Sequence, residues 1–224
     1  MPLLETIETE TGAQPRSTVI VLHGLGADGN DFVPVAHELA LSAVGPVRFV
    51  FPHAPVIPVT INNGYRMRAW YDILGADLVR REDEAGLRRS LDSVLALLAR
   101  EKERGIPSER IVLAGFSQGC AMALLAGLRH GQRLAGIAGL SGYLPLAAQT
   151  VAERSPANAA TPIFLAHGSQ DNVVPIGRGR EARDALQAIG HPVEWREYPM
   201  AHSVCMEEIA DLNQWLLKVL ASTA

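Results

Sequence analysis

A serine flanked by two glycines is the side chain in this sequence best suited to covalent catalysis. Residues 115–119 read G-F-S-Q-G, after the apolar run Ile111–Ala114 and before a helix-forming stretch that begins at Ala121. This order of strand, G-x-S-x-G and helix is typical of a nucleophile elbow, a turn so tight that the serine takes a strained backbone conformation. The Ser117 hydroxyl then lies at a helix N-terminus, which favours developing negative charge. We predict that Ser117 is a nucleophile.

So short a pattern also arises by chance, and a second segment of this chain serves as a comparison. Residues 139–143 read G-L-S-G-Y and also follow an apolar run, but Tyr143 stands where the second glycine is needed. The elbow requires small residues on both sides of the serine so that strand and helix approach each other. The sequence therefore favours Ser117 over Ser141.

A serine hydroxyl is a weak nucleophile, so it needs a base and an acid that orients the base. In proteins with this elbow, the acid and then the histidine follow the serine along the chain. That order excludes His23, His37 and His53, and leaves His130, His167, His191 and His202. Of these four, His202 lies in a loop after the last apolar strand and before the C-terminal helix. We predict that His202 is the base, with a surface loop histidine as the alternative.

The acid must lie between Ser117 and His202. Asp171 follows a predicted strand by four residues and precedes the V-V-P segment that begins the next helix. A carboxylate there can accept a hydrogen bond from the histidine, fix its tautomer and stabilise the imidazolium. The alternative is an aspartate that caps a turn or a helix.

Two backbone amides are needed to stabilise the oxyanion that forms during acyl transfer. The first should belong to Gln118, which follows the nucleophile, and the second to the loop after an early strand. That loop reads H-G-L-G from His23, so we predict the Leu25 amide as the second donor. Gly24 beside it would let the backbone approach the substrate.

Bulk composition restricts the class of protein. Of 224 residues, 48% are hydrophobic and 20% charged, with a net charge of −4 and two cysteines. These values are ordinary for a soluble domain and argue against nucleic acid as a main partner, against stable membrane insertion and against a disulfide framework. Without a signal-like N-terminus, a cytoplasmic location is expected. Because no histidine and cysteine cluster has metal spacing, we expect no metal.

Apolar runs alternate with helical stretches along the chain. We predict strands over Thr18–His23, Val47–Phe51, Arg110–Ala114, Leu134–Leu140, Pro162–His167 and Val193–Tyr198, and helices over Asp31–Ser42, Glu84–Arg104, Gln118–Arg129, Ile176–Ile189 and Met206–Leu220. This alternation predicts one α/β domain over residues 1–224, with a mostly parallel central sheet, helices on both faces and no large cap domain. Residues 1–15 are expected to be flexible. Ligands of such sheets bind at the carboxyl ends of the strands.

These motifs together resemble the phospholipase/carboxylesterase family, which includes small bacterial carboxylesterases, acyl-protein thioesterases and lysophospholipases. The similar segments begin with H-G-L-G-A-D at His23, G-F-S-Q-G at Gly115, H-G at His167 followed by Asp171, and A-H ending at His202. The resemblance covers about residues 19–216. It implies an α/β-hydrolase fold, ester or thioester hydrolysis without a cofactor, and the same three catalytic residues.

The long segment from Pro52 to Tyr71 is the candidate substrate-binding loop, because long loops near a site often bind ligands. Its apolar side chains include Ile57, Met67 and Trp70, which we predict, with Gly24, to contact an acyl chain. The same apolar surface would suit a dimer contact.

The predicted activity is a serine carboxylesterase that acts on short to medium acyl esters through an acyl-enzyme. An acyl-protein thioesterase or lysophospholipase of the same mechanism is the first alternative, since all three reactions share the acyl-enzyme. A hydrolase-fold binding protein without catalysis is a remote alternative, because it usually has a broken triad. The expected partner is a small acyl ester or thioester, and a homodimer is possible.

Overall fold

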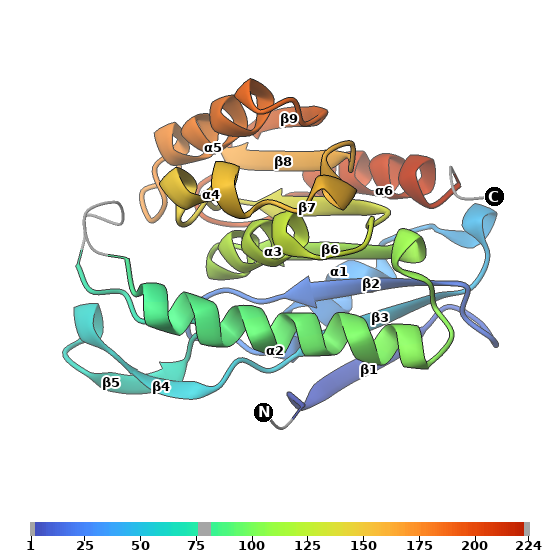
Figure 1. The fold of residues 1–224 in the computed structure, drawn as a ribbon, viewed down its shortest axis with the longest axis horizontal. Coiled ribbons are helices and arrows are strands. Elements are labelled where there is room, and N and C mark those ends of the chain that lie inside the picture. Colours follow the sequence, from blue (N-terminus) through green and yellow to red (C-terminus); the bar gives the residue numbers. More distant parts are fainter. Residues whose placement is uncertain (1–2, 76–81, 222–224) are drawn as a thin grey trace.

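The computed structural model describes residues 3–75 and 82–221, in which a seven-stranded sheet forms the centre (Figure 1). The strands are β1 (Thr6–Glu10), β2 (Ser17–Leu22), β3 (Val47–Pro52), β6 (Ile111–Phe116), β7 (Gly136–Leu140), β8 (Ile163–Gly168) and β9 (Val193–Tyr198). Their spatial order is β1-β3-β2-β6-β7-β8-β9. Every neighbouring pair is parallel except β1 with β3. The predicted mostly parallel sheet is confirmed.

The N-terminal segment differs from the prediction of a flexible stretch over residues 1–15. Thr6–Glu10 form the edge strand β1, which pairs antiparallel with β3. Two ion pairs at 2.9 Å join this strand to other segments: Glu10 pairs with Arg48 of β3, and Glu8 pairs with Arg100, which lies outside the sheet. An edge strand that is only half-buried needs no apolar run, so its T-I-E-T-E sequence carries little strand signal.

Helices cover both faces of the sheet. They are α1 (Val33–His37), α2 (Glu84–Glu103), α3 (Gln118–Arg129), α4 (Ala147–Glu153), α5 (Ile176–Ala188) and α6 (Met206–Ala221). Short 3-10 turns are η1 (Gly29–Phe32), η2 (Ser42–Val44), η3 (Thr60–Asn62), η4 (Ser108–Arg110) and η5 (Pro156–Asn158). Buried residues of α2, α3 and α5 share one core cluster, and those of α1 and α6 share the other. The predicted helix over Asp31–Ser42 is shorter and broken, and α4 was not predicted.

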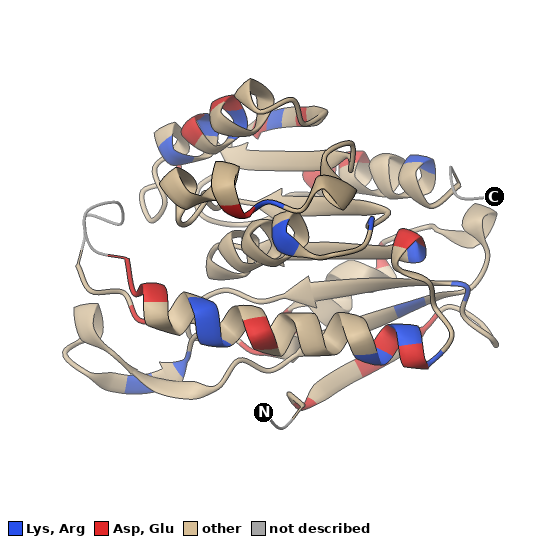
Figure 2. Cartoon of the chain, viewed as in Figure 1, with Lys and Arg blue, Asp and Glu red and all other residues tan. Residues whose placement is uncertain are grey.

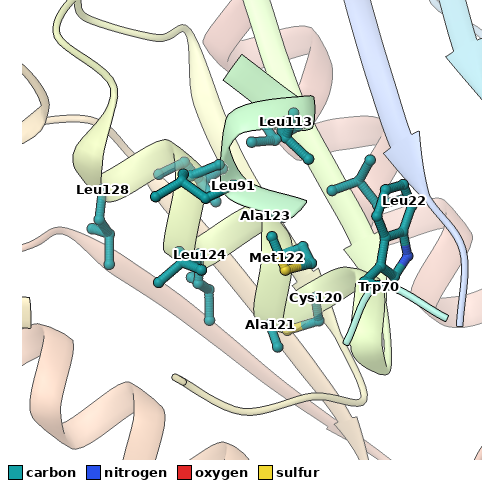
Figure 3. Packing of buried hydrophobic residues seen from close by; sticks show 14 of the residues in the cluster. Leu22, Trp70, Leu91, Leu113, Cys120, Ala121, Met122, Ala123, Leu124 and Leu128 are labelled. Atoms are coloured by element: carbon teal, nitrogen blue, oxygen red, sulfur yellow. The ribbon is translucent and has the colours of Figure 1, made fainter. Parts of the chain in front are cut away.

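Helix α3 has the most buried position, because it packs on β6 and β7 and also contacts α2. Its residues 118–128 are all buried, and charged side chains gather instead on α2 and α5 (Figure 2). Figure 3 shows α3 residues such as Met122 packed beside Leu22, Leu91 and Trp70. A helix buried all round must be apolar all round, which explains its A-M-A-L-L-A-G-L sequence.

The long segment after β3 is a hairpin rather than an irregular loop. Strands β4 (Val56–Val59) and β5 (Tyr65–Arg68) pair antiparallel and are joined through η3. Asn63 and Gly64 have φ angles of 54° and 75°, a left-handed turn that these two residue types tolerate. The hairpin lies at the edge of the molecule toward which the parallel strands point (Figure 1). It is thus near the carboxyl ends of the strands, where the candidate site also lies.

No helix in the described ranges is both long and apolar enough to span a membrane.

Candidate active site

Ser117 lies at the sharp turn between β6 and α3, with φ 56° and ψ −117°. A Cβ atom at Gly115 would lie 2.1 Å from the Gly119 carbonyl oxygen, and one at Gly119 would lie 1.9 Å from the Leu22 carbonyl oxygen. Both distances are far below van der Waals contact, so only glycine fits at either position. The G-x-S-x-G spacing therefore follows from how closely helix α3 approaches strands β6 and β2.

Three side chains form a continuous chain of hydrogen bonds. His202 Nε2 lies 2.9 Å from Ser117 Oγ, and His202 Nδ1 lies 2.7 Å from Asp171 Oδ2. A carboxylate can only accept, so Nδ1 carries the proton and Nε2 is free to accept the serine proton. The Asp171 side chain is fully buried and that of His202 is 15% exposed. The arrangement can deprotonate Ser117 and hold the resulting imidazolium.

The loop that carries Asp171 is bound tightly to the loop that carries His202. The Gln170 amide donates to the Met200 carbonyl at 3.0 Å, and the Ser169 amide donates to the Tyr198 carbonyl at 2.8 Å. A Cβ atom on Gly168 would lie 2.4 Å from the Met200 carbonyl oxygen. The glycine in the H-G-S-Q-D sequence is therefore required for the close approach of the two loops.

Phe116 packs against the His202 ring, and two backbone amides bind the Asp171 carboxylate. The Phe116 ring lies 4.7 Å from the His202 ring, centroid to centroid. The second carboxylate oxygen, Asp171 Oδ1, accepts hydrogen bonds from the amides of Val173 at 2.9 Å and Val174 at 2.8 Å. These contacts fix both planes, so the imidazole needs little reorganisation to accept a proton.

The loop after β2 presents its backbone to Ser117. A Cβ atom at Gly24 would lie 3.4 Å from the Ser117 Cβ atom, so the Gly24 backbone lies against the serine. The Gly26 amide donates to the Arg68 carbonyl, and the Ala27 amide donates to the Gly24 carbonyl. Within the described part of the chain, the Leu25 amide has no acceptor and is free to bind an anion.

His23 and Trp70 hold this loop from below. His23 Nδ1 donates to the Gly24 carbonyl at 2.7 Å, while its Nε2 accepts from the Ala54 amide at 3.0 Å. Burial lowers the pKa of His23, which agrees with a neutral ring. The Trp70 indole donates to the His23 carbonyl at 2.9 Å. The position of Gly24 is thus determined by buried side chains of two other segments.

Gln118 contributes its backbone at the N-terminus of α3 and uses its side chain elsewhere. Its Oε1 accepts from the Trp70 amide at 3.0 Å and its Nε2 donates to the Tyr71 carbonyl at 2.9 Å. The first amides of a helix have no partner within the helix. The Gln118 amide therefore lies next to Ser117 with its side chain bound away from the reacting atoms.

A cleft of about 740 Å³ opens above Ser117 and His202. Most of its lining is apolar, and these residues include Leu25, Phe32, Ile61, Ile73, Phe116, Val173, Val174 and Val204. Gly24, Gln118, Tyr71 and Tyr143 also line it. Among the described lining residues, Asp31 is the one that belongs to the Asp, Glu, Lys and Arg types. The site thus combines an activated serine with an apolar chamber.

Residues 4–220 match the phospholipase/carboxylesterase family. The chain belongs to this family. Acyl-protein thioesterase 1 of Gibberella zeae is 41% identical, over 93% of this chain and 92% of that protein. Acyl-protein thioesterase 1 of Mycosarcoma maydis is 42% identical, over 98% of this chain and 99% of that protein. The crystal structure of Zea mays acyl-protein thioesterase 2 has a TM-score of 0.84 at 30% identity, covering 96% of this chain and 99% of that one.

Membership of the phospholipase/carboxylesterase family makes this protein an ester hydrolase with the α/β-hydrolase fold. The fold and the resemblance predicted from its motifs are confirmed. The structure brings together the five residues predicted for the reacting centre, which are Ser117, Asp171, His202, Leu25 and Gln118. Gly24, which was predicted to contact the substrate, also lines the cleft. Their individual roles are taken up below.

Three side chains that were predicted to contact the substrate do not line the cleft. Ile57 and Met67 are cross-strand partners in the β4–β5 hairpin, and neither lines the cleft. Trp70 is 1% exposed and packs in the core beneath the loop. From the same segment, Ile61 and Tyr71 face the cleft instead. Hydrophobicity alone could not separate the two groups, because hairpin pairing decides which face each side chain takes.

Tyr71 and Tyr143 are cleft residues that the sequence did not identify. Their hydroxyl oxygens lie 2.7 Å apart in a buried position. Burial raises the pKa of Tyr143 to about 12 and that of Tyr71 well above its usual value, so both stay neutral and one donates to the other. The available signal was the G-L-S-G-Y segment after β7, since residues that follow parallel strands gather at one edge.

Neither cysteine of this hydrolase takes part in a disulfide. Cys120 and Cys205 are both free, and burial raises the pKa of Cys120 to about 12. A Cβ atom at Gly142 would lie 2.5 Å from Cys120 Sγ, so the thiol fills the space beside β7. Within the described ranges, histidine, cysteine and carboxylate side chains form no group of three able to bind a metal.

Proposed function

We propose that this protein hydrolyses acyl thioesters, with S-acylated proteins as the substrate class, through a serine acyl-enzyme. The observation that carries the proposal is the Ser117–His202–Asp171 hydrogen-bond chain at the floor of an apolar cleft. Relatives of 38–42% identity that cover nine-tenths or more of the chain carry the name acyl-protein thioesterase 1. They favour the thioesterase, which was the alternative predicted from the sequence, over the carboxylesterase that acts on short to medium acyl esters.

In the first half of the proposed reaction, His202 Nε2 takes the proton from Ser117 Oγ as the oxygen attacks the thioester carbonyl. The Leu25 and Gln118 amides donate to the oxyanion, and Asp171 stabilises the imidazolium. The tetrahedral intermediate then breaks its carbon–sulfur bond. The cysteine thiolate leaves with the proton from His202, and the acyl group remains on Ser117.

Water completes the cycle in the second half. His202 accepts a proton from water, whose oxygen attacks the acyl-enzyme carbonyl, and the same two amides hold the second oxyanion. Collapse returns the proton to Ser117 Oγ and releases a fatty acid. The roles require no group beyond the chain itself and water.

A panel of substrates tests the proposal. Purified protein is assayed on an S-acylated peptide, its O-acyl serine analogue, p-nitrophenyl esters of increasing chain length and a lysophospholipid, each beside Ser117→Ala. We expect the thioester to have the highest kcat/KM, with all hydrolysis lost in Ser117→Ala. A higher kcat/KM on p-nitrophenyl acetate or butyrate than on the thioester would instead support the short-chain carboxylesterase. Hydrolysis that survives in Ser117→Ala would exclude the serine mechanism.

A further inference from the structure

His167 is a buried histidine next to the reacting centre that the proposed mechanism does not use. It lies near the end of β8 with 1% of its surface exposed, and it does not line the cleft. Its Nε2 is 2.8 Å from the Val174 carbonyl oxygen and 3.4 Å from Asp171 Oδ2. A carbonyl oxygen only accepts, so Nε2 carries a hydrogen. It donates this hydrogen to the Val174 carbonyl, and the separation from the carboxylate is longer.

The turn from Asp171 to Val174 is held at both of its polar ends. The Val173 and Val174 amides donate to Asp171 Oδ1, while the Val174 carbonyl receives the His167 hydrogen bond. Rotation of the Asp171 carboxylate would break the two amide contacts. Movement of the turn would break the contact to His167. The His167 ring therefore restrains Val174, whose amide donates a hydrogen bond to the Asp171 carboxylate.

The His167 ring is itself fixed by its neighbours. A Cβ atom at Gly179 of α5 would lie 2.4 Å from His167 Nδ1 and 2.9 Å from the Trp195 ring. The Trp195 ring lies 6.3 Å from the His167 ring, centroid to centroid. Glycine at position 179 thus creates the space that the imidazole occupies, and the ring has little freedom to turn.

The charged and titratable groups that face His167 are Asp171, His202 and Glu197, its partner on β9. Burial lowers the pKa of His167, so the ring stays neutral at physiological pH. A cationic His167 would compete with His202 for Asp171 Oδ2. A neutral ring donates one hydrogen bond without that competition.

We propose that His167 is a positioning residue, which fixes the Asp171 turn so that Oδ2 is directed at His202. The proposal rests on the serine mechanism described above. Because His167 acts on the acid and not on the substrate, its loss should lower kcat and leave KM nearly unchanged. A less restrained Asp171 also stabilises the His202 imidazolium less, so the acidic limb of the kcat/KM profile should move to lower pH.

Two substitutions separate the hydrogen bond from packing. His167→Leu removes the donor and keeps an apolar side chain of similar bulk, whereas His167→Gln places an amide donor near the position of Nε2. We expect His167→Leu to lower kcat about tenfold or more, with KM within about twofold and the acidic limb lower by about half a unit. His167→Gln should recover kcat to within about threefold of the wild type.

His191 provides the matched control, since it is also a buried histidine but lies in the turn before β9. His191→Leu should leave kcat and the acidic limb unchanged. If His167→Leu does not fold, Gly179→Ala displaces the ring from α5 without removing it, and the same fall in kcat and the same shift are expected. An unshifted limb in the folded His167 or Gly179 variant, or failure of Gln to restore kcat, overturns the proposal.

A readout without substrate keeps this inference distinct from the proposed function. The Nδ1 hydrogen between His202 and Asp171 should give a downfield proton resonance at low pH in the wild type and in Ser117→Ala. Its loss in His167→Leu and its return in His167→Gln support the positioning role even if no tested substrate is hydrolysed. An unchanged resonance in His167→Leu refutes the role, whereas failure of the proposed function appears only as wild-type inactivity on the panel.

Discussion

Replacing Glu208 by Gln should stabilise this hydrolase at alkaline pH and leave its stability almost unchanged in acid. Glu208 lies in the first turn of α6 and is fully buried. Among the described residues, neither of its carboxylate oxygens has a hydrogen-bond partner. Burial raises its pKa from the ordinary 4.5 to about 8, and the nearby Cys205 amide offsets part of that rise.

The sign of the effect follows from which state loses its proton first. As pH rises, Glu208 ionises near 4.5 in the unfolded chain and near 8 in the folded protein. The stability contribution of this group is therefore fully present below 4.5 and declines until the folded carboxyl also ionises. A rise of this size corresponds to ~5 kcal/mol at most. We expect about half of it, because the side chain and nearby solvent relax when the charge forms.

That free energy is large enough for a thermal measurement. In a domain of this length, 1 kcal/mol changes Tm by about 2–4 °C. Glu208→Gln should then raise Tm by roughly 5–10 °C near pH 9 and by little near pH 4, because glutamine cannot ionise.

The assay is thermal unfolding followed by circular dichroism, at several pH values between those limits. Glu207→Gln is the matched control, because Glu207 is the preceding residue in the same turn and is exposed to solvent. It removes the same charge from the same helix terminus and should change Tm little at any pH. An equal Tm change at all pH values in Glu208→Gln, or destabilisation near pH 9, would refute the reasoning.

Three further substitutions test the geometry of the site. Gly119→Ala places a Cβ atom 1.9 Å from the Leu22 carbonyl oxygen. We expect the free energy of unfolding, measured by chemical denaturation, to fall by more than about 3 kcal/mol. A near-neutral result would contradict the close approach of α3. Asp171→Asn should lower kcat by about ten-thousand-fold with an unchanged circular dichroism spectrum, and near-normal kcat would exclude Asp171 as the acid. Trp70→Phe removes the hydrogen bond from the indole to the His23 carbonyl. We expect kcat to fall about tenfold, because the Gly24 and Leu25 backbone loses a restraint. An unchanged kcat would show that this hydrogen bond is not needed to position the loop.

Much of the reacting centre could be predicted from local sequence. The glycines around Ser117 are required by a contact between adjacent elements, so they leave a short pattern in the chain. Asp171 and His202 could be located because chain order and the ends of apolar strands restrict the choice. Each of these inferences depends on elements that the sequence marks strongly, namely β6, α3, β8 and β9.

The errors share a different physical origin. Strand β1 lacks an apolar run because it lies at the edge of the sheet. Ile57, Met67 and Trp70 are apolar, as Ile61 is, so hydrophobicity alone does not show which of them lines the cleft. Whether such a side chain faces the cleft, the hairpin partner or the core depends on the register of β4 with β5 and on contacts across the molecule. No local pattern encodes those contacts.

The sequence by itself therefore determined the fold class, the serine at the turn between β6 and α3 and the chain order of the side chains that are hydrogen-bonded to it. Each of these depends on periodicity or on short-range steric limits. Only the tertiary structure decided the lining of the cleft, the Tyr71–Tyr143 pair and the contact of His167 with the Asp171 turn. These features join residues from separate strands and loops. Their distances are fixed when the sheet brings the carboxyl ends of its strands to one edge, and spacing along the chain carries no trace of them.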